Sequence, residues 1–476
     1  MHTSLRKKYF GNRAFYAMAL SIAVPIMIQN GITQFVGLLD NIMVGRVGEA
    51  QMRGVGVSNT LIFVFNLAVF GAVSGAGIFG AQFYGSGDTE GVRSAFRFKL
   101  IICAVLLALG VGIFLLFGDK LIMLYLLGEG TEAEREASFG FAKSYLLIML
   151  FSFLPFILTQ IYSGTLRETG QTVIPMLAGI VSVLVNLCFN TLLIFGYLGF
   201  PRLGVRGAAI ATVIARFVEA GVVMLWTHRN RRKNPFIVGA YRTLHIQKAL
   251  FVQIGRKTLP LMINETLWAG GMALLSQCYS LSGLLVVPAY TISSTVSNVF
   301  NVAFLAMGSA IGIIVGQLLG ADKMEQAVDT DRKLIVFSVL ICFFIGGIMA
   351  ALSHAIPQIY NTTQPVRDLS SKFLLIIALA MPINSLANAC YFTLRSGGKT
   401  FVTFLFDSFY VCIFTVPLAY ALHYWAQLSI VPLFLICQLV DLGKCAVGLI
   451  LIRKGVWLQN IVKKEEHREH GVLQEP

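Results

Sequence analysis

Three acidic residues lie within strongly apolar stretches of the sequence, where an ionised carboxylate is costly to bury. They are Asp40, Glu265 and Asp407. Ionisable groups inside membrane-spanning segments cost several kcal/mol and are usually retained because they handle ions or substrates. A carboxylate in such surroundings can bind a monovalent cation or take up a proton, so these positions are the first candidates for chemistry.

Asp40 lies near the end of one apolar stretch, and two later stretches supply further oxygen donors. Asn186 and Asn190 lie one helical turn apart, and Thr212 follows in the next stretch. A carboxylate, two amide oxygens and a hydroxyl suit a hard monovalent cation such as Na+, or a titrating proton; no other metal site is expected. The alternative is that Asp40 caps its helix or lies at the membrane interface, since the stretch ends close by.

Two further acids have a basic residue three positions away: Glu219 with Arg216, and Asp441 with Lys444. Residues three apart share one helix face, so each pair can neutralise itself. The interpretation is a structural ion pair in each case, with a role in transport as the alternative.

The elements that must position these residues are membrane-spanning helices. The chain has 476 residues, 56% hydrophobic and only 13% charged, against about 25% charged in ordinary soluble domains. Apolar runs near the length needed to cross a bilayer recur twelve times. The first is too long for a removable signal peptide, and no cleavage site follows it. The runs cover about 14–39, 55–82, 98–117, 141–163, 173–197, 207–227, 258–280, 286–318, 333–357, 371–394, 401–424 and 428–453.

The first part of one half of the chain repeats in the other at a constant offset of 235 residues, as Pro25 with Pro260 and Gln82 with Gln317 show. A second block follows at an offset of 228, in which Thr165-Leu166-Arg167 returns as Thr393-Leu394-Arg395. Duplicated apolar halves are typical of membrane transporters that rock one lobe against another around a central site. The predicted fold is therefore an all-α integral membrane protein with twelve transmembrane helices in two pseudo-symmetric six-helix lobes. The expected divisions are an N-lobe (1–227), a basic cytoplasmic linker (228–257), a C-lobe (258–457) and a solvated cytoplasmic tail (458–476).

The acids do not follow this symmetry. The repeat counterpart of Glu265 is Asn30, and that of Asp40 is Leu275. An acid needed for folding should tend to appear in both copies, so the asymmetry favours a functional role for both acids. Glu265 has no basic residue at the preceding three or four positions. Its alternative role is a hydrogen bond to a neighbouring helix.

The net charge of +14 sets orientation rather than indicating a nucleic-acid partner. With an even number of spans, most basic residues fall on the side that holds both termini and the linker. Basic residues are retained on the cytoplasmic side. We therefore expect a multi-pass protein of the cell membrane with both termini cytoplasmic, and no nucleic acid bound.

The sequence contains no enzyme motif in a fitting structural context. The GxGxxG match at 75–80 lies inside a predicted membrane helix, with no preceding strand. It therefore indicates a helix-packing face of small residues and not a dinucleotide-binding loop. There is no Walker, GxSxG or HExxH sequence, and the eight cysteines form no CxxC. The sequence therefore predicts neither an enzyme nor a bound cofactor.

With these residues assembled, the chain resembles the multidrug and toxic compound extrusion (MATE) family of efflux transporters over essentially all twelve spans. The motifs that carry the resemblance are Leu39-Asp40-Asn41-Ile42-Met43-Val44-Gly45-Arg46, Gly80-Ala81-Gln82-Phe83-Tyr84-Gly85-Ser86-Gly87-Asp88, Leu166-Arg167-Glu168-Thr169-Gly170, Leu394-Arg395-Ser396-Gly397-Gly398-Lys399-Thr400, and Pro260 to Glu265.

The resemblance implies a V-shaped chamber that alternates between cytoplasmic and outward openings, with Na+ or H+ exchanged for amphipathic, often cationic, compounds. It implies that Asp40, with Asn186, Asn190 and Thr212, is the N-lobe ion site. It assigns Glu265 to a C-lobe site whose second member, an aspartate in one bacterial branch, is Asn384 here. That departure weakens C-lobe cation coordination unless Asp407 supplies the missing charge. A monomer in the lipid bilayer is expected.

Two alternatives share this architecture: a flippase for a lipid-linked precursor, and an exporter of one specific metabolite. A flippase needs cationic side chains in its chamber to pair with pyrophosphate. Arg216 and Lys444 are the clear candidates within spans, and each has an acidic neighbour.

Overall fold

The computed structural model describes residues 7–45, 47–126 and 131–463, without the side chains of residues 36, 38–42 and 45. Across these ranges the chain is helical, with no strand. The helices are α2 (Arg13–Gly45), α3 (Glu49–Gly85), α4 (Thr89–Leu126), α5 (Glu132–Glu168), α6 (Val173–Phe195), η1 (Tyr197–Gly199), α7 (Val205–Arg229), η2 (Pro235–Ile237), α8 (Lys248–Ser280), α9 (Val286–Gly320), α10 (Met324–Leu352), η3 (Ile356–Ile359), α11 (Gln364–Ser396), α12 (Thr400–Phe404), η4 (Leu405–Phe409), η5 (Val411–Thr415), α13 (Val416–Tyr424), α14 (Ile430–Leu439) and α15 (Asp441–Arg453).

Eleven helical segments in the described ranges are long and apolar enough to cross a membrane. The remaining expected span, 258–280, is α8, whose apolar run is interrupted by Asn264-Glu265-Thr266. The span expected at 401–424 contains two stretches of π-helix, η4 and η5. The span expected at 428–453 is broken at Val440 into α14 and α15. The all-helical membrane fold predicted from the sequence is confirmed.

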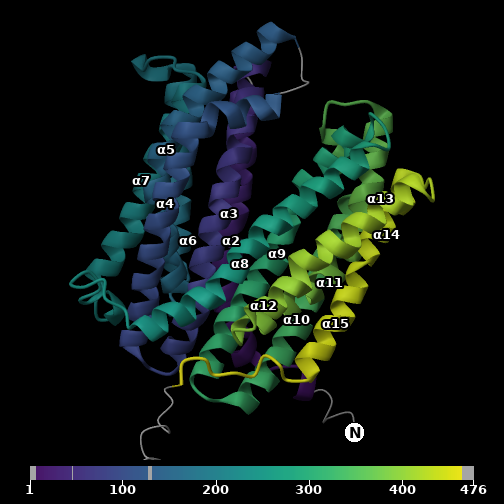
Figure 1. The fold of residues 1–476 in the computed structure, drawn as a ribbon. Coiled ribbons are helices and arrows are strands. Elements are labelled where there is room, and N and C mark those ends of the chain that lie inside the picture. The colour runs from purple at the N-terminus through teal and green to yellow at the C-terminus, as the bar shows by residue number, and fades with distance from the viewer. Residues whose placement is uncertain (1–6, 46, 127–130, 464–476) are drawn as a thin grey trace, which may run out of the picture.

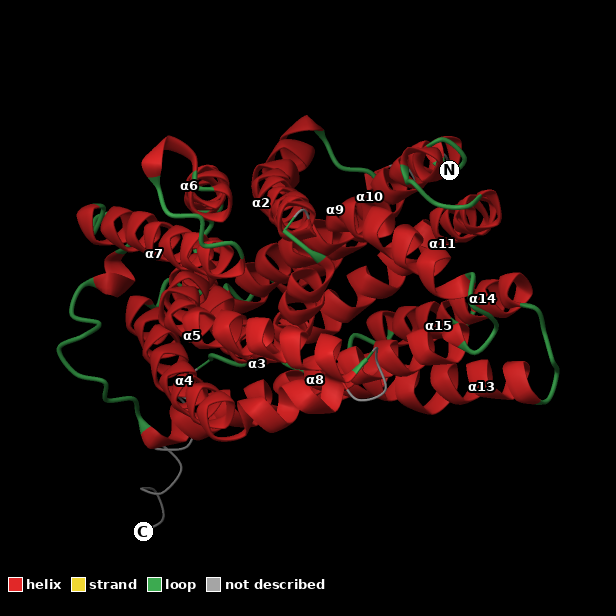
Figure 2. Ribbon diagram, turned by 90° about the horizontal axis from the view of Figure 1, so that it is seen from above, coloured by secondary structure: helices red, strands yellow, loops and turns green. Residues whose placement is uncertain are grey.

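The helices from α2 to α7 form one group and those from α8 to α15 form another, and the two groups diverge toward the upper end in Figure 1. Seen from above, α2, α3, α8 and α9 lie between the outer helices of the two groups (Figure 2). These four central helices make the contacts between groups, since α3 packs on α8 and α9, and α2 packs on α9.

At the lower end, α3 and α9 approach each other so closely that only glycine fits. A Cβ on Gly85 would lie 1.9 Å from the carbonyl oxygen of Gln317, and a Cβ on Gly320 would lie 1.9 Å from that of Gln82. Gly85 and Gly320 are repeat counterparts, as are Gln82 and Gln317. The contact therefore uses the same residues from both halves of the chain.

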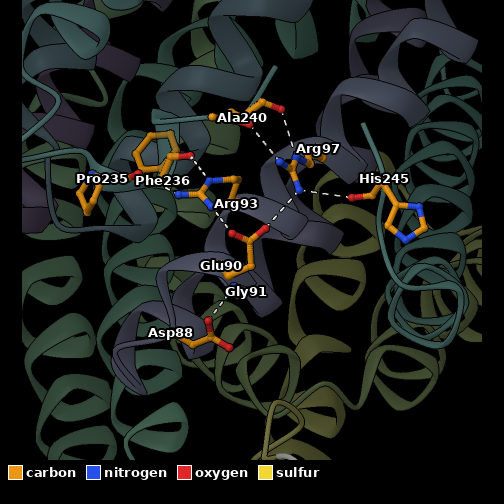
Figure 3. Close-up of polar contacts among 10 residues, drawn as sticks. Asp88, Glu90, Gly91, Arg93, Arg97, Pro235, Phe236, Ala240 and His245 are labelled. Carbon is orange, nitrogen blue, oxygen red and sulfur yellow. Dashed lines mark hydrogen bonds and ion pairs between the residues drawn. The ribbon is translucent and has the colours of Figure 1, made fainter. Parts of the chain in front are cut away.

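The segment between α7 and α8 is fixed to the start of α4 by arginine side chains (Figure 3). Arg97 donates to the carbonyl oxygens of Gly239, Ala240 and His245 at 3.0, 3.1 and 3.2 Å, and also pairs with Glu90 at 3.1 Å. The linker is thus bound to the first group of helices rather than hanging free.

The residues after α15 form a strap, defined here as residues 457–463, that crosses the lower end of the molecule. Trp457 is buried, Asn460 donates to the carbonyl oxygen of Gly320 at 3.2 Å, and the Ile461 amide donates to Gln82 Oε1 at 2.9 Å. Lys463 pairs with Asp322 at 2.8 Å, and this hydrogen bond raises the pKa of Lys463 above its ordinary value. This first part of the expected solvated tail therefore packs against the bundle. The rest, 464–476, lies outside the described residues.

The linker contacts predict that Arg97→Gln lowers stability by about 2 kcal/mol, because charged hydrogen bonds to three carbonyl groups are lost. Arg332 is its repeat counterpart; among the described residues it has no hydrogen bond or ion pair and lies 5.9 Å from the Tyr9 ring, so Arg332→Gln is the matched control. Thermal unfolding in detergent measures both variants. Equal stability of the two would contradict a structural role for the linker contacts.

Candidate functional site

A continuous polar network lies inside the second group of helices, formed by α8, α11, η4 and α15. Asn264 Nδ2 donates to Asp407 Oδ2 at 3.1 Å and lies 3.4 Å from the Tyr391 hydroxyl oxygen. Tyr391 donates to Glu265 Oε1 at 3.3 Å, and Lys444 Nζ pairs with Asp407 Oδ1 at 2.6 Å. Glu265 and Asp407, both predicted from the sequence, are thus joined through Asn264 and Tyr391.

The π-helical segment η4 positions Asp407 and Ser408 against α8. The Ser408 hydroxyl donates at 2.5 Å to the backbone carbonyl of Asn264, and its amide donates to Asn264 Oδ1 at 3.2 Å. A π-helix inserts an extra residue into a turn and is frequent at functional sites. Because Asn264 is 1% exposed and bonded from several sides, it fixes the spacing between the two acids.

Lys444 does not pair as expected. The sequence predicted mutual neutralisation of Asp441 and Lys444, but in the described structure Lys444 pairs with Asp407. The physical reason is that η4 brings Asp407 within 2.6 Å of the Lys444 ammonium, and a buried carboxylate needs a cation close by.

The side chain of Tyr410, the residue after η4, contacts the last span where α14 meets α15. Tyr410 donates to the carbonyl oxygen of Val440 at 2.9 Å. A Cβ on Gly443 would lie 2.7 Å from the Tyr410 hydroxyl oxygen, so the close approach requires glycine. This contact lies one turn before Lys444 and holds the last span against the segment that carries Asp407.

Asn384 and Glu265 have different surroundings. Asn384 is partly buried on α11 and makes no side-chain hydrogen bond within the described residues, so it does not join the network. Glu265 accepts the Tyr391 hydrogen bond, which is the alternative role considered for it. Among the described residues it has no ion pair, whereas Asp407 has one.

In the first group of helices, the structure brings together three of the four predicted N-lobe residues. Asn190 Nδ2 donates to Asn186 Oδ1 at 2.9 Å, and Asn186 Nδ2 donates to Thr212 Oγ1 at 3.3 Å. Asn186 and Asn190 are 5% and 1% exposed, so their amides face the interior rather than lipid. The fourth member, Asp40, lies in α2, and its side chain falls outside the described residues.

A cavity of about 260 Å³ opens beside this cluster. Thr212 and Arg216 line it from α7, and Gly37 and Val44 line it from α2. Arg216 pairs with Glu219 at 3.2 Å, as predicted from their spacing. Further polar lining residues are Asn59, Asn66, Tyr145 and Ser152.

Several polar contacts were missed by sequence reasoning because their partners are distant in the chain. Lys99, fully buried on α4, binds both carboxylate oxygens of Glu168 at 2.7 Å and Thr165 Oγ1 at 3.0 Å. Asn264 and Ser408 are each adjacent in sequence to a predicted acid, and this adjacency could have identified them as members of the site. No feature of the sequence could have identified Tyr391.

Comparison with known proteins gives a consistent result. The family model MatE matches residues 25–192 and again 260–421, so each half of the chain matches it once. The chain is 24% identical over 464 residues to the probable multidrug resistance protein NorM of Thermotoga maritima, covering 95% of each. It is 27% identical over 417 residues to the probable multidrug resistance protein YoeA of Bacillus subtilis, covering 86% of this chain and 87% of that protein.

The chain belongs to the MATE family. MATE proteins are transporters and not enzymes, as the absence of enzyme motifs in the sequence predicted. In fold, the chain matches a solved structure described as an outward-facing conformation of a multidrug resistance MATE family transporter of the MOP superfamily. The TM-score is 0.83 at 17% identity, covering 92% of this chain and 95% of that chain.

The Lys444–Asp407 pair predicts a specific pattern of stability. Lys444→Met should cost about 3 kcal/mol, because it leaves the Asp407 carboxylate buried without its cation. Asp407→Asn in the same protein should recover part of that loss, whereas Asp441→Asn alone should have little effect. Unfolding in detergent of the wild type, the three single variants and the two double variants that contain Lys444→Met gives both coupling energies. A larger coupling of Lys444 to Asp441 than to Asp407 would contradict the assigned pairing.

Proposed function

We propose that this protein is a secondary active efflux transporter that exports amphipathic, cationic compounds in exchange for Na+ or H+ by alternating access. The observation that carries the proposal is the C-lobe network, in which Lys444 neutralises Asp407 through an ion pair while Glu265, among the described residues, has hydrogen bonds but no ion pair. Arg395 attracts the Glu265 carboxylate without forming an ion pair with it. Glu265 is therefore available to bind an ion, a proton or the positive charge of a substrate. The names of NorM and YoeA, both multidrug resistance proteins, favour the same substrate class.

The N-lobe supports a second coupling site around Asp40. Gly37 and Val44 line the N-lobe cavity and lie seven residues apart on α2, so position 40 falls on the same helix face. Thr212 lines that cavity from α7 and is bonded to Asn186. The register of α2 therefore supports the proposal that Asp40 belongs to this N-lobe site.

The contacts at the lower end support alternating access. Gln82 donates to the carbonyl oxygen of Ser396 at 2.9 Å, and Gln317 donates to that of Glu168 at 2.8 Å. Each glutamine thus binds the end of a helix in the other lobe, and both contacts follow the sequence repeat. We call these two hydrogen bonds, with the glycine contacts of Gly85 and Gly320, the latch.

The latch lies at the end of the molecule that holds the basic linker and the strap (Figure 1). Retention of basic residues on the cytoplasmic side makes this the cytoplasmic end, with both termini in the cytoplasm. We infer that the latch closes the transporter toward the cytoplasm in an outward-open state, and that it breaks in the inward-open state. The protein acts as a monomer in the lipid bilayer, since each chain supplies both lobes.

The cation pairing disfavours the flippase alternative. Arg216 is paired with Glu219 and Lys444 with Asp407, so neither side chain carries a surplus charge for a pyrophosphate. An exporter of one specific metabolite would have all the structural features described above. A transport assay distinguishes it from a multidrug exporter by the range of substrates exported.

Reconstituted vesicles test the coupling acids. Asp40→Asn and Glu265→Gln should each abolish export of a cationic dye driven by an imposed Na+ or H+ gradient, with normal amounts of protein in the membrane. Asn30→Gln, at the repeat counterpart of Glu265, is the matched control and should transport normally. Wild-type rates in Glu265→Gln would remove the C-lobe from the mechanism. Export of one anionic metabolite and of no cationic dye would contradict the substrate class.

The latch predicts the balance between conformations. Gln82→Leu with Gln317→Leu should shift the ratio of open to closed cytoplasmic ends about tenfold toward open, because each lost hydrogen bond contributes about 0.5–1.5 kcal/mol. Spin labels at residues 86 and 321, repeat-related positions beyond α3 and α9, report the distance between lobes. Gln277→Leu, an exposed glutamine at the far end of α8, is the control. An unchanged distance distribution would show that the latch does not stabilise the closed cytoplasmic end.

A further inference from the structure

A cavity of about 460 Å³ lies between the first turns of α8 and the start of α12. Three basic side chains line it: Arg256 and Lys257 from α8, and Lys399 from the turn before α12. No acidic residue is among the lining residues. Its size falls within the usual range for small-ligand sites of about 300–1,000 Å³.

The three positive charges are uncompensated. None of these side chains has an ion pair or a hydrogen bond among the described residues, although the basic side chains of Arg93, Lys99, Lys333 and Lys463 at the same end are all paired with acids. Lys257 and Lys399 are partly buried, and their charges repel each other. Like charges held together at partial burial favour an anion between them.

Apart from Gln253 and Thr400, the rest of the cavity is apolar and continues onto an exposed apolar surface. The apolar lining residues are Ala249, Val252, Pro260, Phe401 and Val402. Of these, Val252 and Phe401 are 40% and 61% exposed, and the neighbouring Leu259 is 57% exposed. Helices α8 and α12 lie next to each other on the face toward the viewer in Figure 1. A group of cations above an exposed apolar surface fits a ligand with an anionic head and hydrocarbon chains.

We propose that this cavity binds the phosphodiester headgroup of an anionic phospholipid, with the acyl chains against Val252, Leu259 and Phe401. Arg256, Lys257 and Lys399 bind the phosphate oxygens, as basic pockets between transmembrane helices do. The cavity lies at the end that carries the basic linker, so the lipid comes from the cytoplasmic leaflet under the orientation proposed above. The site itself does not depend on what the protein transports.

The lipid bridges two helices that lead into the C-lobe network. Pro260 lines the cavity one turn before Asn264 on α8, and Lys399 lies two turns before Asp407 on the neighbouring segment. A headgroup bound to Lys257 and Lys399 relieves their repulsion and holds these helix ends together. Bound lipid therefore stabilises the arrangement in which Asn264 bonds to Asp407.

Native mass spectrometry of the full-length protein with added phosphatidylglycerol tests the site. Replacement of Arg256, Lys257 and Lys399 by Gln should weaken phosphatidylglycerol binding about a hundredfold, since each basic residue contributes about 1 kcal/mol. Phosphatidylcholine, whose headgroup has no net charge, should bind weakly to wild type and variant alike. The matched control replaces the exposed Arg229, Arg232 and Lys233 by Gln, which removes the same charge from the same end.

Equal phosphatidylglycerol binding by wild type and the cavity variant would overturn the proposal, as would equal loss in the control variant. Displacement of phosphatidylglycerol by millimolar inorganic phosphate would assign the cavity to a free anion instead. If the triple variant fails to assemble, Lys399→Gln alone should weaken binding about fivefold. Lipid binding and dye export are measured in separate assays. A negative result in the lipid-binding assay therefore does not count against the transport proposal.

Discussion

Burial of charge is the constraint on which the rest of this structure depends. A lone ion in the membrane interior is costly, so each buried charge needs an opposite charge or several hydrogen bonds. Lys99 with Glu168, Arg216 with Glu219 and Lys444 with Asp407 satisfy it by pairing. Glu265 is held by a hydrogen bond from Tyr391 without an ion pair among the described residues. Arg395 attracts its negative charge without forming an ion pair, so a ligand or a proton can still balance that charge.

The repeat and the acids serve different purposes. Repeat-related residues form the contacts between lobes: Gln82 and Gln317 bind helix ends across the interface, and Gly85 and Gly320 allow the backbones to meet. The coupling acids have no acidic counterpart in the other half. In the proposed mechanism, the symmetric interface would let the lobes rock as two similar bodies, and the asymmetric acids would let an ion act on one lobe at a time.

The sequence predicted the spans, the repeat and the Arg216–Glu219 pair. These features depend on local patterns: the length of an apolar run, or a spacing of three residues that places two side chains on one face of a helix. Sequence reasoning failed for Asp441 and Lys444, which have the same spacing, because Asp407 of another helical segment forms the ion pair with Lys444. Glu168 and Lys99 are 69 residues apart, and no local pattern connects them. Ion pairs between helices depend on how the helices pack. A single sequence indicates such a contact only where a repeat or a neighbouring acid points to the residue involved.

The central claim is that the ion state of Glu265 sets the arrangement of the two lobes. Spin labels at Glu132, at the start of α5, and Leu284, in the turn before α9, report the separation of the lobes at the outer end. In wild-type protein in nanodiscs, this distance should change with pH or with Na+ concentration. In Glu265→Gln, which keeps only the proposed Asp40 site, the change in distance should be clearly smaller than in the wild type. A variant that responds to pH and Na+ as the wild type does would contradict the account.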